Sequence, residues 1–276
     1  LLKSAKVKIR VQDARDYHAL SRLLNDIKPN IIIQLAAVSH ANRSNKDPYS
    51  TFDHSFRTLE NSLDWARSKD SNVEQFIFFS SSMVYGNFES DQVDEDTNCE
   101  PLGIYGALKY GSEKIIIGYK QTFGLPYTII RPSALYGERC ISRRVGQIFI
   151  ENSLMGKEIV MSDEGREALD FTYINDLVDG VTQCIGNKNA FNQIFNLTYG
   201  KACSIADMSE IIKKYFPSTK VRNIERDKLM PKRGTLNVDK ARDLIGYNPS
   251  WPLEKGYPKY IDWYKNFVNE NPKILV

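Results

Sequence analysis

Three short apolar runs in the first half of the chain limit its fold more than any other feature of the sequence. They lie at residues 31–37, 75–80 and 127–131, and each follows a longer segment with helical spacing of apolar residues, at 16–27, 47–69 and 104–123. An apolar run without polar alternation is typical of a strand buried on both faces, as in a parallel sheet covered by helices. Alternating strands and helices therefore predict an α/β fold with a doubly wound parallel sheet.

Two further segments extend this prediction, one with an additional strand and one with a second lobe. Residues 6–12 alternate in the manner of a strand and carry β-branched side chains, so they predict a strand before the first helix. After Pro132, short strands and helices alternate with polar loops, which predicts a smaller α+β lobe over the carboxyl edge of the sheet. We expect residues 1–132 to form the sheet domain, residues 174–200 to return to it, and residues 133–276 to form mainly the second lobe.

Composition narrows the classes of function. The 37 Lys and Arg against 34 Asp and Glu leave a net charge of +3, which is too small for a nucleic-acid platform. No apolar run approaches the roughly 18 residues that cross a bilayer, so we expect no membrane partner and a soluble, cytoplasmic protein. The four cysteines and three histidines show no ligand spacing, which predicts no metal site.

One tyrosine and one lysine have a spacing that suits proton transfer. Tyr105 and Lys109 lie four residues apart in a helical segment, so the ammonium can favour the phenolate form of Tyr105. Chance pairs are expected among 15 tyrosines, and Tyr110 with Lys114 is one. Five residues along a helix is a rotation of about 140°, so the two pairs cannot face one cleft. An exposed helix pair without function is the alternative interpretation.

A cluster of serines ends the second apolar run. Ser80, Ser81 and Ser82 precede Met83, and their hydroxyls should emerge at the carboxyl edge of the sheet, where ligands bind in such folds. Serines that only cap and turn the chain are the alternative here.

This serine cluster, with Tyr105 and Lys109 about 20 residues beyond it, resembles the extended short-chain dehydrogenase/reductase family. The match is to its NAD-dependent nucleotide-sugar epimerases and dehydratases. Similar segments follow in family order along the whole chain, at residues 13–14, 34–37, 131–132, 136–137, 170–176, 195–196, 232–234 and 240–249. The resemblance implies a Rossmann-type cofactor domain, a substrate lobe and a homodimer formed through residues 48–69 and 104–123.

The resemblance also implies roles for single residues. Tyr105 would take a proton from a sugar hydroxyl, most simply at C4, while Lys109 lowers its pKa and Ser81 hydrogen-bonds the reacting oxygen. NAD is the implied cofactor, with NADP left open, and its contacts would be Asp13, Ala14, Leu35, Ala36, Ala37, Ser80, Tyr105, Lys109 and Pro132. A nucleotide-diphosphate sugar is the implied substrate, and its contacts would be Ser82, Met83, Arg166, Asn196 and Arg233.

The sequence also departs from the family pattern. No G-x-x-G-x-x-G turn follows a strand, although that turn binds the cofactor pyrophosphate in the family. In the family strand order 3-2-1-4-5-6, the strand at 6–12 would lie about 14 Å from the strand at 31–37, with a gap between them. We therefore expect a fragment of a longer enzyme that binds NAD poorly on its own. Leu169 also replaces an expected phosphate-binding Arg, and Arg166 and Arg144 are the candidates to take its place on the phosphates.

Met83 bears on the reaction. The family's 4,6-dehydratases carry an acidic residue at this position as the base at C5, and a thioether cannot abstract that proton. The favoured function is therefore a nucleotide-sugar epimerase that acts through a 4-keto intermediate. A 4,6-dehydratase or a 4-keto-sugar reductase is the alternative within the family. A catalytically inactive binding or scaffold protein is the alternative outside it.

Overall fold

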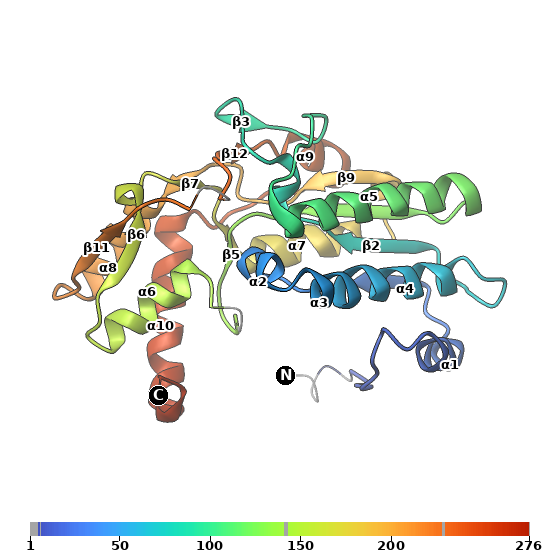
Figure 1. The fold of residues 1–276 in the computed structure, drawn as a ribbon, viewed down its shortest axis with the longest axis horizontal. Coiled ribbons are helices and arrows are strands. Elements are labelled where there is room, and N and C mark those ends of the chain that lie inside the picture. The colour runs from blue at the N-terminus through green and yellow to red at the C-terminus, as the bar shows by residue number, and fades with distance from the viewer. Residues whose placement is uncertain (1–4, 6, 141–142, 228–229, 276) are drawn as a thin grey trace.

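The computed structural model describes residues 5, 7–140, 143–227 and 230–275. Four parallel strands form its central sheet, in the order β1 (Ile31–Gln34), β2 (Gln75–Phe79), β4 (Tyr127–Arg131) and β9 (Gln193–Asn196). Helices cover both faces of this sheet (Figure 1). The predicted doubly wound α/β fold is confirmed, and the three apolar runs supply β1, β2 and β4.

Alternate residues of the strands point to different helices. Phe76 and Phe78 pack in one core with α4 (Thr58–Ala66) and α5 (Gly103–Phe123). Ile77, between them, packs on the other face with α7 (Ile174–Cys184) and α9 (Asp239–Ile245). A strand that must be apolar on both faces explains why these runs show no polar alternation.

The strand predicted at residues 6–12 is not formed: residue 6 lies outside the described residues, and residues 7–12 form no strand. The side chains of Val7, Ile9 and Val11 are 51%, 60% and 97% exposed. An alternating pattern becomes a strand only where a neighbouring strand accepts its backbone hydrogen bonds, and β1 pairs with β2 alone in the described residues. The expected 14 Å separation from the next strand therefore has no counterpart here. The chain continues into α1 (Tyr17–Ile27), where the Asp16 side chain caps the first turn.

A second core lies beyond the carboxyl ends of the strands. It packs α6 (Val145–Leu154), α8 (Ile205–Tyr215) and α10 (Leu253–Glu270) against β6 (Ile159–Ser162), which pairs with β11 (Val221–Ile224). This core contains many aromatic side chains, among them Tyr257 and Tyr260 of α10, which are fully buried. Figure 1 shows this group of elements beside the sheet. The predicted division of the chain at residue 132 stays a prediction.

The remaining elements are short. The long helix predicted over 47–69 is divided into α3 (Pro48–Phe52), the π-helical turn η1 (Asp53–Arg57) and α4. The others are α2 (Ala41–Lys46), β3 (Gln92–Val93), β5 (Leu135–Tyr136), β7 (Ala168–Leu169), β8 (Thr172–Tyr173), β10 (Cys203–Ser204), β12 (Thr235–Leu236) and the turns η2 (Ser82–Tyr85), η3 (Asp163–Gly165), η4 (Lys188–Ala190) and η5 (Pro272–Leu275).

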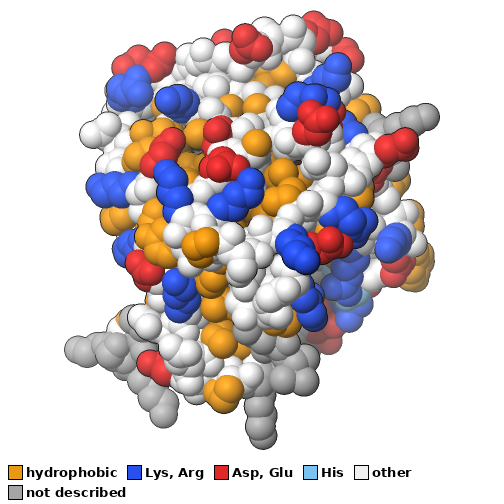
Figure 2. Space-filling model, turned by 90° about the vertical axis from the view of Figure 1, so that its left-hand side faces the viewer, with side chains coloured by type: hydrophobic (Ala, Val, Ile, Leu, Met, Phe, Trp, Pro, Cys, Tyr) orange, Lys and Arg blue, Asp and Glu red, His pale blue; other side chains and the backbone are white. Residues whose placement is uncertain are grey.

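The described residues bear on three further kinds of functional feature: a charged patch, a membrane-spanning helix and a metal site. Basic and acidic side chains are interspersed on the face that Figure 2 shows, so this face has no patch of a single sign. None of the helices in the described part of the chain is both long enough and apolar enough to span a bilayer. Those same residues also hold no group of three or more metal-binding side chains.

Candidate active site

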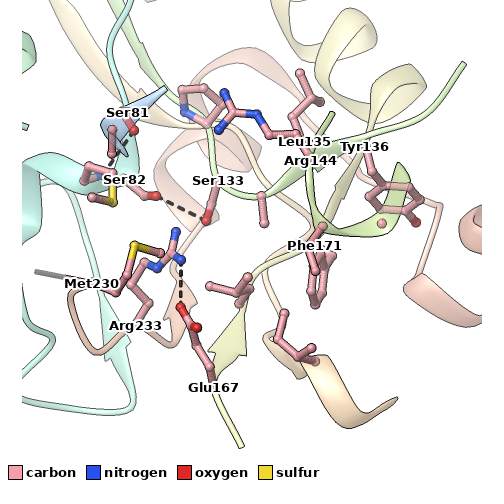
Figure 3. A pocket seen from close by; sticks show the side chains of 18 of the residues that line it. Ser81, Ser82, Ser133, Leu135, Tyr136, Arg144, Glu167, Phe171, Met230 and Arg233 are labelled. Carbon is pink, nitrogen blue, oxygen red and sulfur yellow. Dashed lines mark hydrogen bonds and ion pairs between the residues drawn. The ribbon is translucent and has the colours of Figure 1, made fainter. Parts of the chain in front are cut away.

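A cavity of about 360 Å³ opens where β2 and β4 end. The strand ends contribute Ser80–Ser82 and Pro132–Ala134, α5 contributes Tyr105, and the second lobe closes the far side (Figure 3). Carboxyl ends of parallel strands are where ligands bind in open α/β folds, because the crossover helices leave a crevice there.

Backbone pairing continues beyond the strands and places the serines. The Ser80 and Ser82 amides donate to the carbonyls of Ile130 and Pro132 at 2.8 and 2.9 Å. The Ser81 hydroxyl accepts from the Met83 amide at 3.2 Å and so caps η2. The capping interpretation of these serines therefore holds for Ser81, although its side chain still lines the cavity. Ser82 donates to the Ser133 hydroxyl at 3.2 Å (Figure 3).

Tyr105 is placed by the close packing of α5 on η2. A Cβ on Gly106 would stand 2.8 Å from the Met83 carbonyl oxygen, so only glycine permits this approach. The Asn45 side chain accepts the Ile104 amide at 3.0 Å, which satisfies one free donor of the first helical turn. The phenol of Tyr105 consequently reaches the same cavity as Ser81 and interacts with its hydroxyl.

The pKa of Tyr105 differs from the sequence expectation. Burial raises it, whereas the Arg144 guanidinium and the Ser81 hydroxyl oppose that rise. Lys109 was expected to supply the lowering charge, but its Nζ lies 5.9 Å from the centre of the Tyr105 ring and donates to the Phe79 carbonyl at 2.6 Å. Burial lowers the pKa of Lys109 itself to about 8. In this structure, therefore, Arg144 rather than Lys109 is the cation that favours the phenolate.

A second cavity of about 400 Å³ adjoins the first, and Ser39 lines both. Asp13, Ala14, Ala36 and Ala37 line it, as the predicted cofactor contacts should if they face one ligand. A hydrogen bond from Arg15 lowers the pKa of Asp13 to about 2, so its carboxylate stays charged. Leu35 is 65% exposed and is not part of the lining.

These residues fit an elongated dinucleotide at its two ends. The two cavities share Ser39, and Asp13, Ala36 and Ala37 line one of them while Pro132 lines the other. Ser80, Tyr105 and Pro132 line the end beside the reacting groups. The glycine-rich turn for the pyrophosphate has no counterpart in the sequence, so the fit is to the adenosine and nicotinamide ends alone.

The predicted substrate contacts are only partly brought together. Ser82, Met83 and Arg233 line the cavity, and Arg233 pairs with Glu167 at 2.8 Å (Figure 3). Arg166 lies elsewhere: its side chain is 64% exposed and pairs with acidic residues of η3, because the loop holds it at the surface. Asn196 is fully buried, and its amide is occupied by the Tyr85 hydroxyl and the Asn237 carbonyl.

Sequence reasoning missed several residues of the site. Glu167 and Ser133 line the cavity, and Met161, Met208 and Met230 form part of its apolar wall. These residues carry no local motif, because segments far apart in the sequence bring them to the cavity. Among the described residues, no carboxylate pairs with Arg144, whose guanidinium donates to the Ser39 carbonyl at 2.6 Å.

Comparison with known proteins identifies the family of the chain. The model of the NAD dependent epimerase/dehydratase family matches residues 2–198. An uncharacterised UDP-glucose epimerase of Bacillus subtilis is 29% identical, over 86% of this chain and 74% of its own. A UDP-glucuronate 4-epimerase of Thermodesulfobacterium geofontis is 27% identical, over 100% and 85%. The Bacillus cereus UDP-glucuronic acid 4-epimerase, solved with UDP-glucuronic acid and NAD, superimposes with a TM-score of 0.88 at 26% identity, over 96% and 85%.

Proposed function

The chain belongs to the NAD dependent epimerase/dehydratase family, and from this premise we propose that it is a 4-epimerase of a nucleotide-diphosphate sugar. One observation carries the proposal: Ser81 and Tyr105, from different elements, face one cavity at the carboxyl ends of β2 and β4. The names of the relatives point to UDP-glucose and UDP-glucuronate as the first substrates to test.

Each residue of the cavity has a task in this proposal. Tyr105 takes the proton of the sugar O4 hydroxyl and later returns it, while Ser81 hydrogen-bonds the same oxygen. Arg144 favours the charged phenolate, and Arg233 with its buried guanidinium is the candidate contact of the diphosphate. Asp13, Ala36, Ala37 and Lys109 are candidates to hold the cofactor, and bound NAD supplies the acceptor and donor of hydride.

Met83 favours epimerisation over dehydration. Its thioether lines the cavity where a dehydratase needs a base for the C5 proton. The fold alone does not separate the two reactions, because a Streptomyces venezuelae dTDP-glucose 4,6-dehydratase superimposes with a TM-score of 0.86 at 23% identity. A 4-keto-sugar reductase and an inactive scaffold remain the other candidates.

Product analysis by NMR tests the proposal. The chain, saturated with NAD as judged by titration, is incubated in D₂O with UDP-glucose or UDP-glucuronate. A 4-epimer without deuterium at C5 is expected, whereas a dehydratase would exchange that position.

Tyr105→Phe should lower turnover about 10²- to 10⁴-fold, because general acid–base help of that size is lost.

Tyr110→Phe is the matched control, since Tyr110 lies on the same helix and is also paired with a lysine. It should leave turnover unchanged. Equal loss in both variants would remove Tyr105 from the mechanism, and no product at saturating NAD would favour the scaffold function.

The resemblance further supports a homodimer through α3, α4 and α5. Exposed apolar side chains on these helices suit such a contact, namely Tyr49, Phe52, Ile104 and Phe123. A cytoplasmic location stays a prediction from the sequence.

A further inference from the structure

Glu113 lies one helical turn beyond Lys109 and two beyond Tyr105 on α5. Residues four apart share a helix face, so the carboxylate follows the two predicted catalytic side chains towards the sheet. Its side chain is 1% exposed. A charged group at this depth needs partners to compensate for the loss of water.

Two strand ends supply those partners. Arg131, the last residue of β4, binds the carboxylate with two nitrogens, Nε at 3.0 Å and a terminal guanidinium nitrogen at 2.7 Å. Ser80, directly after β2, donates its hydroxyl to the same carboxylate. Glu113 therefore joins α5 to the ends of both central strands.

The strand ends that Glu113 contacts are those that supply residues of the site. Ser80 stands between Phe79, whose carbonyl accepts the Lys109 ammonium at 2.6 Å, and Ser81 in the cavity. Arg131 directly precedes Pro132, which also lines the cavity. A shift of Glu113 would thus move the acceptor of Lys109 and both strand ends that line the cavity.

Stability alone does not explain such a pair. Burying two charges costs about as much as their attraction returns, and apolar residues of similar volume often stabilise a fold at least as well. The carboxylate of Glu113 is paired with Arg131 and also favours the charged form of Lys109.

We propose that Glu113 is a positioning residue, which locks α5 onto the strand ends and holds Lys109 as an ammonium directed at the Phe79 carbonyl. The catalytic purpose of this arrangement rests on the proposed function. The effect of Glu113 on α5 and Lys109 is a property of the chain itself and needs no cofactor or substrate. Glu113 is the charged group that favours the protonated form of Lys109, whereas burial opposes it. The narrow cavity beside Lys109 is otherwise lined by Tyr105 and by uncharged side chains of α3, α5, η1, β2 and residues 37–38.

Glu113→Gln is the decisive variant, since the amide keeps the shape and an acceptor but removes the charge. The measurement is a pH titration of the Lys109 side chain by NMR on lysine-labelled full chain, with the signal assigned by Lys109→Arg. Wild-type protein should titrate near pH 8. In the variant the midpoint should fall by about one pH unit or more, because losing a nearby opposite charge is worth about that much.

Glu151→Gln is the matched control. Glu151 is also a buried, hydrogen-bonded glutamate paired with an arginine, but it lies on α6 in the second lobe. It should lower the melting temperature without moving the Lys109 midpoint. If Glu113→Gln does not fold, the double variant Glu113→Gln/Arg131→Met removes the Arg131 charge that the single variant leaves without its partner, and its Lys109 midpoint is expected to fall in the same direction by a smaller amount.

A folded variant of either kind whose Lys109 midpoint equals that of wild-type protein would overturn the inference. This readout needs neither NAD nor turnover, so it stands or falls separately from the epimerase proposal. If the protein does epimerise nucleotide sugars, turnover of Glu113→Gln should fall more than tenfold at pH 8 with little change in KM, because proton transfer rather than binding is disturbed.

Discussion

At the scale of single residues, two aspartates of segment 170–176 hydrogen-bond backbone amides that lie far away in the sequence. Asp170 is fully buried and accepts hydrogen bonds from the Thr198 hydroxyl and from the amides of Gly200 and Leu236 at 3.0 to 3.2 Å. Asp176 accepts from the amides of Ser250 and Trp251. The sequence of this segment resembles a motif of the family. In the structure, its two aspartates hydrogen-bond the backbone that follows β9 and the backbone of later segments.

Asp170→Asn should destabilise the protein in a pH-dependent way. Burial raises the pKa of Asp170 to about 6, so between pH 4 and 6 the folded chain holds a proton that the unfolded chain releases. The stability that this group contributes is present at low pH and declines as the pH rises through 6. The variant should cost about 1 to 3 kcal/mol, from lost acceptors, and about 1 kcal/mol more at pH 5 than at pH 7.

Urea unfolding at the two pH values measures this difference. Asp243→Asn, on the exposed face of α9, is the control and should behave alike at both. An equal loss for Asp170→Asn at pH 5 and pH 7 would contradict the raised pKa.

At the scale of elements, α5 carries most of the proposed chemistry. Tyr105, Lys109 and Glu113 lie on one face of this helix, and the close approach at Gly106 sets the distance of that face from the strand ends. Tyr110 and Lys114 form their own ring–cation contact and do not line the cavity, as the helical rotation between the two pairs requires.

Gly106→Ala should therefore damage function more than Gly111→Ala. The new methyl group would meet the Met83 carbonyl and push α5 away, and a displacement of about 1 Å can cost about 100-fold in turnover. Nothing lies within 4 Å of a Cβ at Gly111, so alanine there should raise the free energy of unfolding by up to about 1 kcal/mol with turnover unchanged. Thermal melts and turnover of both variants check this, and full turnover in Gly106→Ala would refute the packing argument.

At the scale of the whole molecule, the proposed dimer and the cofactor site depend on surfaces of the sheet domain. The helices on one face of the sheet expose apolar side chains. The cavity at the strand ends is lined by both parts of the chain, whereas the second cavity is lined by residues 12–58 alone. Weak NAD binding by this chain stays a prediction from the missing glycine-rich turn.

Light scattering after size exclusion should give twice the 31.6 kDa mass of the chain. Phe52→Glu should yield the monomer, because a carboxylate in an apolar contact loses its water without a partner. Val178→Glu is the control, since Val178 is exposed on α7, on the other face of the sheet. A monomeric wild-type chain, or monomers from both variants, would count against the proposed dimer face.

The sequence by itself determined three of the four sheet strands and the common helix face of Tyr105 and Lys109. Strands buried on both faces must be apolar throughout, and a four-residue helical spacing must put Tyr105 and Lys109 on one side, so both features are local. The pattern at residues 6–12 was misleading, because a strand also needs a partner that no local pattern can supply.

Only the tertiary structure decided how the charges are distributed. Arg144 rather than Lys109 acts on the phenol, Arg166 stays at the surface, and Glu113 holds the ends of two strands. Each outcome depends on which residues from distant segments share a site and how much water they lose. The sequence order of the residues does not contain that information, because the electrostatic energy of a group depends on its neighbours in space.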